Sequence, residues 1–359
     1  MQRFSPMRRR ILFAAPGMLL ISCGGTSSSE TPTDRRVQDA VVNLDEYAER
    51  TRASSGVPGM AIAVVHEGPI AHLKGYGIRK AGNTDLVNSD TVFQLASVSK
   101  PVASTVIAAL VGQGVTGWDD PLSKHDGSFK LSDAEATRLL TLRDLFCHRS
   151  GLADHAGDLL EDIGYAREEI LFRLRYLPID GRFRKQYAYT NFGLSEAAFA
   201  AARSAGALWE DIAETKLFKP AGMHTASFRH ADYIARTNRA WLHAEEGGKF
   251  VAKYDRNPDA QSPAGGASAS ITDMARWLQL HLGDGMLDGQ RLIPAAALRE
   301  TRTAQIESVP AAQSPAEERI IMRSAGMPMR TAKDANKIVI LARSRWGLQP
   351  AFSWRPPRV

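Results

Sequence analysis

A serine and a lysine stand three residues apart, at positions 97 and 100, and this pair is the first candidate for chemistry in the 359-residue chain. Ser97 and Lys100 form its only S-x-x-K motif. Apolar residues recur at helical spacing over residues 102–111, and Pro101 is harmless only in the first turn of a helix. We therefore predict a largely buried helix that begins near Ser97 and carries Lys100 on the same face.

Such a geometry suits a nucleophile. A serine hydroxyl attacks effectively when a neighbouring base accepts its proton, and a helix N-terminus offers backbone donors to an oxyanion forming beside it. A lysine with a pKa near ~10.4 is charged, and lowering that pKa to about 7 requires roughly 4 to 5 kcal/mol. Burial can supply this free energy, so the hypothesis requires an enclosed Lys100. Taken alone, S-x-x-K is more typical of a capped helix with a surface lysine.

A second candidate motif is Y-x-N, which occurs once, at Tyr189 and Asn191. Side chains two positions apart in extended chain point to the same side. A phenol with a pKa near ~10 acts as a base only where cations hold it close to phenolate. Lys100 is a candidate for that cation, and the Asn191 amide could bond either Lys100 or a substrate carbonyl. By itself, Y-x-N is also typical of a loop with a buried tyrosine.

Taken together, the two motifs resemble the penicillin-recognising serine hydrolases: class C β-lactamases, family VIII esterases and D-alanyl-D-alanine carboxypeptidases. The segments 142–152 (LRDLFCHRSGL) and 217–223 (LFKPAGM) add to the resemblance, which runs from about residue 44 to 318. It implies a mixed α/β fold of the β-lactamase/transpeptidase type. An all-α lobe would pack beside an antiparallel sheet built from both chain ends and flanked by helices, with the site between the lobes.

The resemblance also implies roles. Ser97 would attack a carbonyl and form an acyl-enzyme, Lys100 and Tyr189 would shuttle protons, Asn191 would orient substrate, and water would release the acyl group. The implied substrate is a small molecule or peptide with a carbonyl, namely a β-lactam, a small ester or a D-alanyl peptide, and no metal or cofactor is expected. For His148, which follows a predicted helix, we expect a structural role.

The third motif of this family, K-T-G or H-x-G on a strand near the C-terminus, is where the pattern breaks. There is no K-T-G, and none of the four H-x-G strings fits. Three precede Tyr189, and the fourth falls in the helix predicted from Ser270. The strings begin at His66, His125, His155 and His281.

The missing motif coincides with a basic, aperiodic tail over residues 319–359. We hypothesise that a frameshift or truncation replaced the native C-terminal strands, and the alternative is a divergent C-terminus. In the family that this chain resembles, the same strand also supplies a backbone N–H to the oxyanion, and its loss would impair the enzyme. The second functional reading is accordingly a catalytically defective exported protein that keeps the fold and binds cell-wall peptide.

The N-terminus predicts export. Residues 8–10 are three arginines, residues 11–21 form an apolar segment too short to span a bilayer, and Ser22-Cys23 follows. This resembles a bacterial lipoprotein signal over residues 1–23, which predicts lipidation of Cys23 and a periplasmic, membrane-anchored protein. An ordinary or twin-arginine signal peptide is the alternative. A flexible tether over residues 24–36 would then lead into a hydrolase domain over residues 37–318.

Charge and cysteine content exclude several classes. The formal charge is +6, but residues 24–318 hold 32 basic and 38 acidic side chains, which argues against nucleic-acid binding. With Cys23 as an anchor, Cys147 remains alone, so no disulfide or cysteine metal cluster is expected. The chain has no H-E-x-x-H and no G-x-S-x-G, so a zinc hydrolase and an α/β-hydrolase lack support.

Periodicity and turn signals predict the remaining elements. The expected strands are 60–65 and 70–76 as an antiparallel hairpin, 91–95, and 338–342. The expected helices are 37–48 with its end at Gly56 and Pro58, 142–147, 168–176, 194–205, 208–217, one capped by Ser270, and one opened by Pro294.

Overall fold

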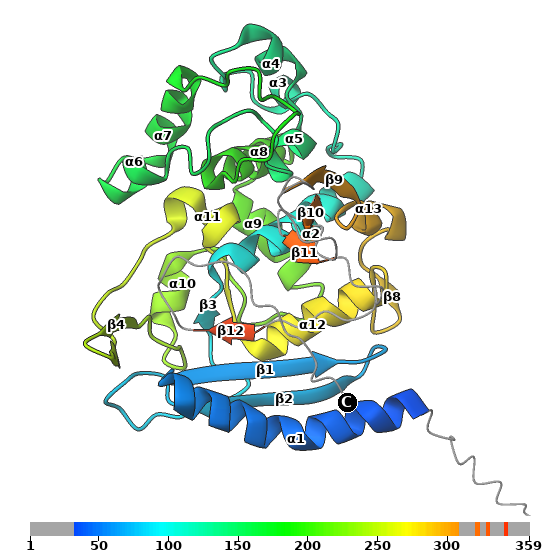
Figure 1. Ribbon diagram of the computed structural model, residues 1–359. Coiled ribbons are helices and arrows are strands. Elements are labelled where there is room, and N and C mark those ends of the chain that lie inside the picture. The colour runs from blue at the N-terminus through cyan, green and yellow to red at the C-terminus, as the bar shows by residue number, and fades with distance from the viewer. Residues whose placement is uncertain (1–31, 309–319, 324–327, 331–340, 344–359) are drawn as a thin grey trace, which may run out of the picture.

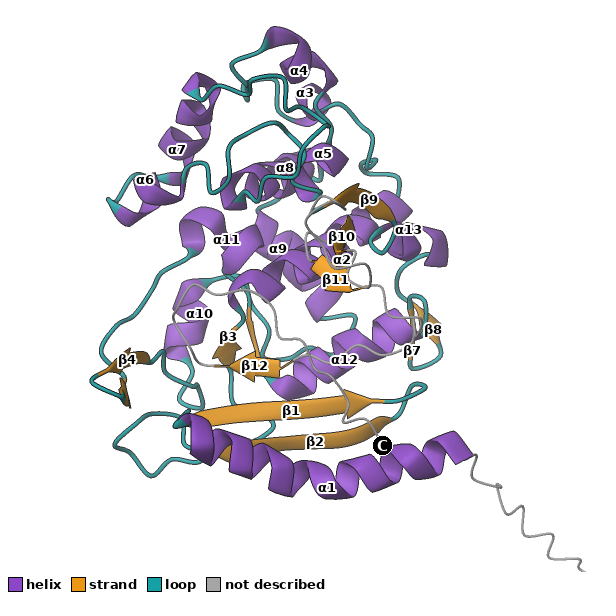
Figure 2. Ribbon diagram, in the orientation of Figure 1, coloured by secondary structure: helices purple, strands orange, loops and turns teal. Residues whose placement is uncertain are grey.

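The computed structural model describes residues 32–308, 320–323, 328–330 and 341–343. A group of helices forms one lobe, and a small sheet with a helix on either side forms the opposite end of the molecule (Figure 1). Helix α2 (Ser99–Gly112) lies between them (Figure 2). This architecture confirms the predicted mixed α/β class with a helical lobe.

The sheet joins the two ends of the chain, as predicted. Its order is β12-β1-β2, with β1 (Gly59–Val65), β2 (Ile70–Gly77) and β12 (Leu341–Arg343) all antiparallel. Ala61 of β1 is paired with Gly75 on one side and with Ala342 on the other. The hairpin prediction is thereby confirmed, and the strand predicted at 338–342 overlaps β12 at residues 341 and 342.

Both faces of this sheet are covered, because successive side chains of β1 point to opposite sides. Ala61, Ala63 and Val65 belong to the main core, on the side of α12 (Ile271–Leu282). Ile62 packs instead with Ala48 of α1 (Pro32–Ser55). The sheet therefore lies between α1 and α12, as Figure 1 shows.

Both covering helices were predicted, although α1 begins five residues earlier than expected. Proline is favoured at the first helical position because its fixed φ suits the helix and its missing N–H has no partner there, so α1 begins at Pro32 and takes in part of the predicted tether. For α12, Ser270 and Asp273 form a reciprocal capping box, which confirms the predicted cap. Residues 1–31, including Cys23, lie outside the described residues.

Helix α2 is the predicted buried helix, and every residue from Ser99 to Leu110 is buried. Its α-helical part begins two residues after Ser97. Strand β3 (Phe93–Gln94) leads into a 3-10 turn, η1 (Ala96–Val98), that carries Ser97. The difference arises at Ala96, whose φ of +47° is left-handed and turns the chain sharply before a regular helix can start.

The helical lobe contains the predicted helices at 142–147, 168–176 and 194–205. They correspond to α5 (Leu142–Phe146), α7 (Arg167–Arg173) with η2 (Leu174–Tyr176), and α8 (Asn191–Ser204). Helix α8 begins three residues before the predicted start, which places Asn191 in its first turn. The lobe also has three short helices that were not predicted: α3 (Leu122–His125), α4 (Ala134–Leu139) and α6 (Asp158–Asp162).

The remaining elements connect the lobe to the sheet. The helix predicted at 208–217 is divided into α9 (Trp209–Ala213) and a π-helical turn, η3 (Glu214–Phe218), and the helix opened by Pro294 is α13 (Ala295–Glu300). Among the described residues, no helix is both long and apolar enough to cross a membrane. The short elements not predicted from the sequence are α10 (His230–Ala235), β4 (Ala244–Glu246), β5 (Lys249–Val251), η4 (Asp259–Gln261), α11 (Ser262–Gly265), β6 (Ser268–Ala269), β7 (Met286–Leu287), β8 (Gln290–Arg291), β9 (Ala304–Glu307), β10 (Ile320–Arg323) and β11 (Pro328–Arg330).

Candidate active site

The fold brings the four predicted site residues into direct contact. Ser97 Oγ lies 2.6 Å from the hydroxyl of Tyr189 and 3.2 Å from Lys100 Nζ. Lys100 Nζ in turn lies 2.7 Å from Asn191 Oδ1. Ser97 and Lys100 come from η1 and α2, and Tyr189 and Asn191 from the segment that enters α8, so residues about 90 positions apart in the chain form one cluster.

Lys100 is enclosed, as the sequence hypothesis required. Its side chain is 0% exposed. Burial, which penalises the charged form, is the main cause that lowers its pKa to about 7. The nearby Arg256 lowers this pKa further, whereas the carboxylate of Asp158 raises it. Near neutral pH a large fraction of Lys100 is therefore an uncharged amine, which is the form that accepts a proton.

The hydrogen-bond partners of Lys100 determine where its lone pair points. Two of them, Asn191 Oδ1 and the backbone oxygen of Ala264 at 3.0 Å, are carbonyl oxygens that only accept. A neutral amine has two N–H donors and one lone pair. Because the two carbonyls take both donors, the lone pair is left for the third partner, the Ser97 hydroxyl.

Tyr189 is a neutral phenol in this arrangement. Burial raises its pKa to about 12, and its hydrogen bond with Ser97 acts in the opposite direction. Its ring also lies over Lys100, with Nζ 4.5 Å from the ring centroid. The phenolate reading considered from the sequence is therefore disfavoured. Instead, a chain of donors runs from the Tyr189 hydroxyl to Ser97 and on to Lys100.

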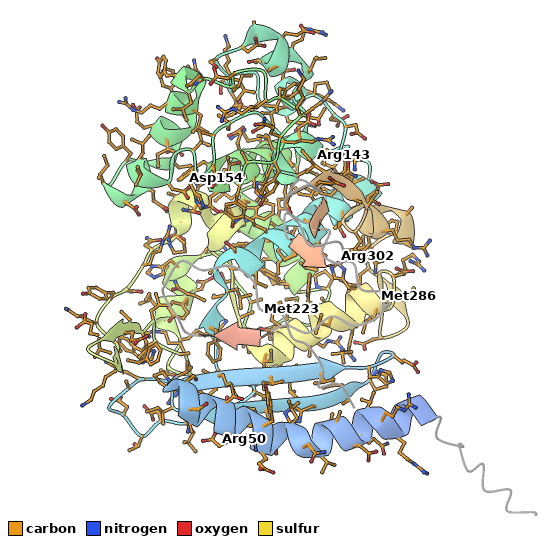
Figure 3. The ribbon with its side chains drawn as sticks, in the orientation of Figure 1. Arg50, Arg143, Asp154, Met223, Met286 and Arg302 are labelled. Atoms are coloured by element: carbon orange, nitrogen blue, oxygen red, sulfur yellow. The ribbon has the colours of Figure 1, made fainter. Side chains whose placement is uncertain are left out.

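The backbone of Tyr189 is held by a segment that sequence reasoning missed. Asp154 Oδ1 accepts the Tyr189 N–H at 2.7 Å, and the His155 N–H donates to the Tyr189 carbonyl at 2.7 Å. Figure 3 shows Asp154 at the edge of the helical lobe that faces α11. The rings of His155 and Tyr189 are also in contact, with centroids 5.3 Å apart. The H-x-G string at His155 was the only sequence signal here, and it was set aside as a third motif.

His148 has the structural role expected from the sequence. Its Nδ1 accepts the N–H of Thr190 at 3.1 Å, and its ring packs on Tyr189 with centroids 4.7 Å apart. The residue is fully buried. The imidazole supports the extended segment that carries Tyr189 and Thr190.

Asp144 gives the segment 142–152, which contributed to the family resemblance, a structural role. This carboxylate is 0% exposed and forms a capping box with Thr141 at the start of α5. Arg149 donates to it at 2.7 Å, and Arg184 donates at 2.8 Å. Asp144 thereby ties α5 to the segments at Arg149 and Arg184, both of which precede Tyr189, and this role is structural rather than chemical.

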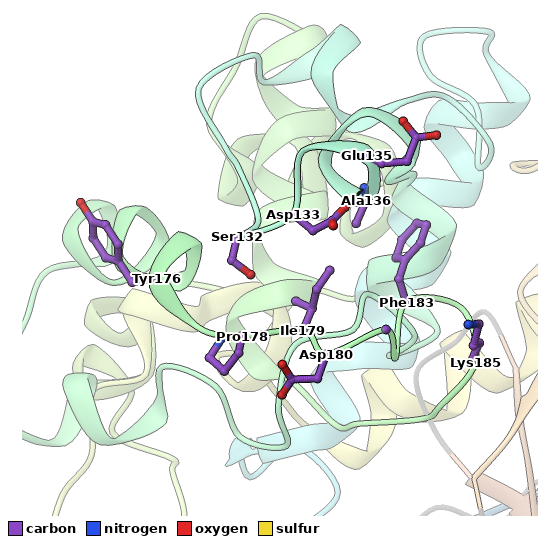
Figure 4. Close-up of a pocket in the computed structure, with 11 residues that line it drawn as sticks. Ser132, Asp133, Glu135, Ala136, Tyr176, Pro178, Ile179, Asp180, Phe183 and Lys185 are labelled. Carbon is purple, nitrogen blue, oxygen red and sulfur yellow. Dashed lines mark hydrogen bonds between the residues drawn. The ribbon is translucent and has the colours of Figure 1, made fainter.

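A surface pocket of about 660 Å³ lies elsewhere, in the helical lobe. Figure 4 shows it between the loop at Ser132 and Asp133 and the segment from Tyr176 to Lys185. None of the four candidate residues lines this pocket. The candidate active site is therefore defined by the contacts around Ser97 and not by this pocket.

The fold and the Ser-Lys-Tyr-Asn cluster together define a serine hydrolase of the β-lactamase type. The model of the family described as Beta-lactamase matches residues 44–353, so the chain belongs to this family. The match includes most of the tail that the sequence suggested to be non-native. Whether that tail is native or frameshifted stays a prediction.

Individual relatives are similar at low identity. Penicillin-binding protein 4 of Amycolatopsis lactamdurans is 28% identical over 70% of this chain and 67% of its own length. The D-alanyl-D-alanine-carboxypeptidase/endopeptidase AmpH of Escherichia coli K12 is 27% identical over 77% of this chain and 70% of its own. Unguisins hydrolase ungD' of Aspergillus campestris is 26% identical over 70% of this chain but only 48% of its own length.

Among solved structures, the octameric penicillin-binding protein homologue from Pyrococcus abyssi has a similar fold. Its TM-score is 0.67 at 20% identity, and the similarity covers 79% of this chain and 64% of that chain. The protein thus spans slightly less than two thirds of that neighbour. This likeness establishes the β-lactamase/transpeptidase fold and, at such identity, nothing about substrate.

Proposed function

We propose that this protein is a serine hydrolase that transfers acyl groups through an acyl-Ser97 intermediate. The single observation that carries the proposal is the position of Ser97 Oγ, 2.6 Å from the Tyr189 hydroxyl and 3.2 Å from a buried Lys100 amine. Nucleophile, base and orienting group within hydrogen-bond reach of one another are what nucleophilic catalysis requires.

In the proposed acylation step, Ser97 Oγ attacks a substrate carbonyl carbon while its proton passes to the neutral amine of Lys100. The Ser97 N–H lies at the start of a helical segment, where amides have no intrahelical acceptor, and is a candidate donor to the oxyanion. As the bond to the leaving group breaks, the Tyr189 hydroxyl gives its proton to the leaving atom, and the Lys100 ammonium returns a proton to Tyr189. In deacylation, water takes the place of the leaving group and attacks the ester carbonyl. The proton transfers then run in reverse, from water through Tyr189 to Lys100 and from Lys100 back to Ser97 Oγ as the acyl group leaves.

The proposed substrates are β-lactams, small carboxyl esters or D-alanyl peptides. The names of the relatives support an acyl substrate of the amide or ester type, since they include a penicillin-binding protein, a D-alanyl-D-alanine carboxypeptidase and a hydrolase of unguisins. All three classes contain a carbonyl on which the cluster of Ser97, Lys100, Tyr189 and Asn191 could act. The cluster is therefore compatible with each class.

Covalent labelling tests the proposal. We expect a fluorophosphonate probe or a fluorescent penicillin to label the purified protein, and intact mass spectrometry to locate the adduct on Ser97. The Ser97→Ala variant should lose the label. Ser104→Ala is the matched control, because Ser104 is buried in the same helix, away from the Ser97 contacts. If the folded wild-type protein takes neither probe, the alternative is favoured, namely a defective relative that binds cell-wall peptide without turnover.

A comparison of substrates then resolves the class. Nitrocefin reports β-lactam hydrolysis, a short-chain nitrophenyl ester reports esterase activity, and release of D-alanine from a D-alanyl-D-alanine peptide reports carboxypeptidase activity. We expect at least one of these rates to fall in parallel with labelling in Ser97→Ala.

We further propose that the protein is exported and anchored to the membrane by a lipid on Cys23. The support is the basic, apolar and Ser22-Cys23 order of residues 1–23. Mass spectrometry of the mature N-terminus should find an acylated cysteine as the first residue. In a Cys23→Ala variant the protein should leave the membrane fraction, whereas an unmodified N-terminus after a different cleavage site would favour an ordinary signal peptide.

A further inference from the structure

One carboxylate lies directly behind the proposed catalytic residues and has no part in the mechanism above. Asp158 Oδ2 accepts the Asn191 Nδ2–H at 2.9 Å and also faces His155 Nδ1 at 2.7 Å. Its side chain is 22% exposed. Asp158 is the first residue of α6, yet both of these contacts are to side chains rather than to the backbone of that helix.

The orientation of the Asn191 amide decides what Lys100 can do. As it stands, Oδ1 faces Lys100 and takes one of its N–H donors. A flipped amide would point Nδ2–H at Lys100, and this donor would compete with the Ser97 hydroxyl for the lone pair. The flip would also aim the amide oxygen at a carboxylate. Asp158 therefore selects the productive orientation by accepting Nδ2–H.

We propose that Asp158, held by His155, is a positioning residue that fixes the Asn191 amide with its oxygen toward Lys100 and so directs the lysine lone pair at Ser97. This inference rests on the proposed function of Ser97 as an acylated nucleophile. It adds two positioning residues, Asp158 and His155, to the four residues already described.

The backbone of this segment supports the assignment. His155 has a φ of +56°, an uncommon conformation for a residue with a side chain, and such conformations tend to persist at functional sites. Gly157 has a φ of +95°, and a Cβ there would lie 3.0 Å from the Phe192 ring of α8. The segment is thus packed tightly against the start of α8, and the same turn that strains His155 brings both its N–H to Tyr189 and its ring to Asp158.

Several charged groups surround Lys100, and they set the expected pH behaviour. The Asp158 carboxylate raises the pKa of Lys100, whereas Arg256 lowers it. Arg256 is itself paired with Glu161 of α6 at 2.7 Å. Tyr189 is neutral below about pH 12. A further carboxylate, that of Asp154, faces His155, with Oδ2 3.7 Å from Nε2. Because the Asp158 charge raises the pKa of Lys100, removing that charge should lower this pKa.

Two substitutions at Asp158 separate orientation from charge. Asp158→Asn can still accept the Asn191 N–H through its amide oxygen but carries no charge, whereas Asp158→Ala has neither property. The control is Asp162→Asn, in the same short helix and exposed. The measurement is the rate of Ser97 acylation by a fluorophosphonate probe as a function of pH, with the fraction of folded protein measured in parallel.

We expect Asp158→Ala to lower the plateau rate by about 10- to 100-fold, by analogy with the loss of a group that orients a metal-ligating side chain. Asp158→Asn should retain most of the plateau rate, but its acylation rate should begin to rise at a lower pH than in wild type. Asp162→Asn should match wild type. His155→Ala should lower the plateau less than Asp158→Ala.

The proposal is overturned if both Asp158 variants keep the wild-type plateau and pH profile. It is also overturned if any loss of rate only follows the loss of folded protein, because that result indicates a structural role. Failure of the proposed function is distinguishable, since wild-type protein would then take no label at any pH.

Discussion

The pH dependence of acylation is the sharpest consequence of the buried lysine. If Lys100 is the general base, only its neutral form accepts the Ser97 proton. With its pKa lowered to about 7 by burial, half of the molecules are active at pH 7. An ordinary lysine with a pKa near ~10.4 would be neutral in roughly one molecule in 2,500 at that pH. Enclosing Lys100 is therefore worth about 10³-fold in active fraction.

The assay is single-turnover labelling of Ser97. Its rate is measured by stopped flow or in quenched samples from pH 5 to pH 10. We expect the logarithm of the rate to rise with unit slope below about pH 7 and to level off above it. Lys100→Arg keeps a cation that cannot deprotonate, so it should remove the rise and lower the plateau by about 10²- to 10⁴-fold. Lys124→Arg, at an exposed position on α3, is the matched control.

Two results would refute this reasoning. A rise in the acylation rate centred near pH 10 would mean that Lys100 titrates as a solvated lysine despite its burial. Alternatively, Lys100→Arg with a rate close to wild type would mean that the base is another group. The control variant should behave as wild type in either case, which separates an effect at the site from a general effect of arginine on expression or folding.

Further predictions concern stability, the phenol and the tail. Because the pKa of Lys100 is lower in the folded than in the unfolded state, the unfolded chain binds the additional proton between pH 7 and about pH 10.4, so the free energy of unfolding should rise with pH by about 1.4 kcal/mol per unit there. Urea titrations should find this rise in wild type and not in Lys100→Met. Tyr189→Phe should slow turnover of a nitrophenyl ester by about 10²- to 10⁴-fold with an unchanged melting temperature, and an unchanged rate would exclude Tyr189 from proton transfer. Asp144→Ala breaks a helix cap and the two ion pairs that a buried carboxylate makes with partly exposed arginines, and it should cost about 3 to 5 kcal/mol by thermal denaturation, against less than about 1 kcal/mol for the exposed Asp119→Ala. Finally, translating the gene in its other two frames should yield a tryptophan-glycine strand followed by H-x-G in place of residues 319–359, and its absence would favour a divergent C-terminus.

Local sequence signals predicted much of the fold because they report on interactions close in the chain. The hairpin at β1 and β2 follows from two apolar runs around a turn, and α12 follows from a serine cap and a 3.6-residue period. The buried character of α2 follows from its nearly continuous apolar residues. Short helices such as α6 and α11 carry too few residues to show a period, so they were missed.

The sequence alone pointed to the four residues of the candidate site, because S-x-x-K and Y-x-N each occur once and together resemble the motifs of a known family. It could not determine what those residues become when the chain folds. The pKa of Lys100 depends on burial and on carbonyls that include Ala264, 164 residues away along the chain. The orientation of Asn191 likewise depends on Asp158, 33 residues before it. Desolvation and hydrogen-bond direction arise from contacts between distant segments, so only the tertiary structure decided which amine is neutral and where its lone pair points.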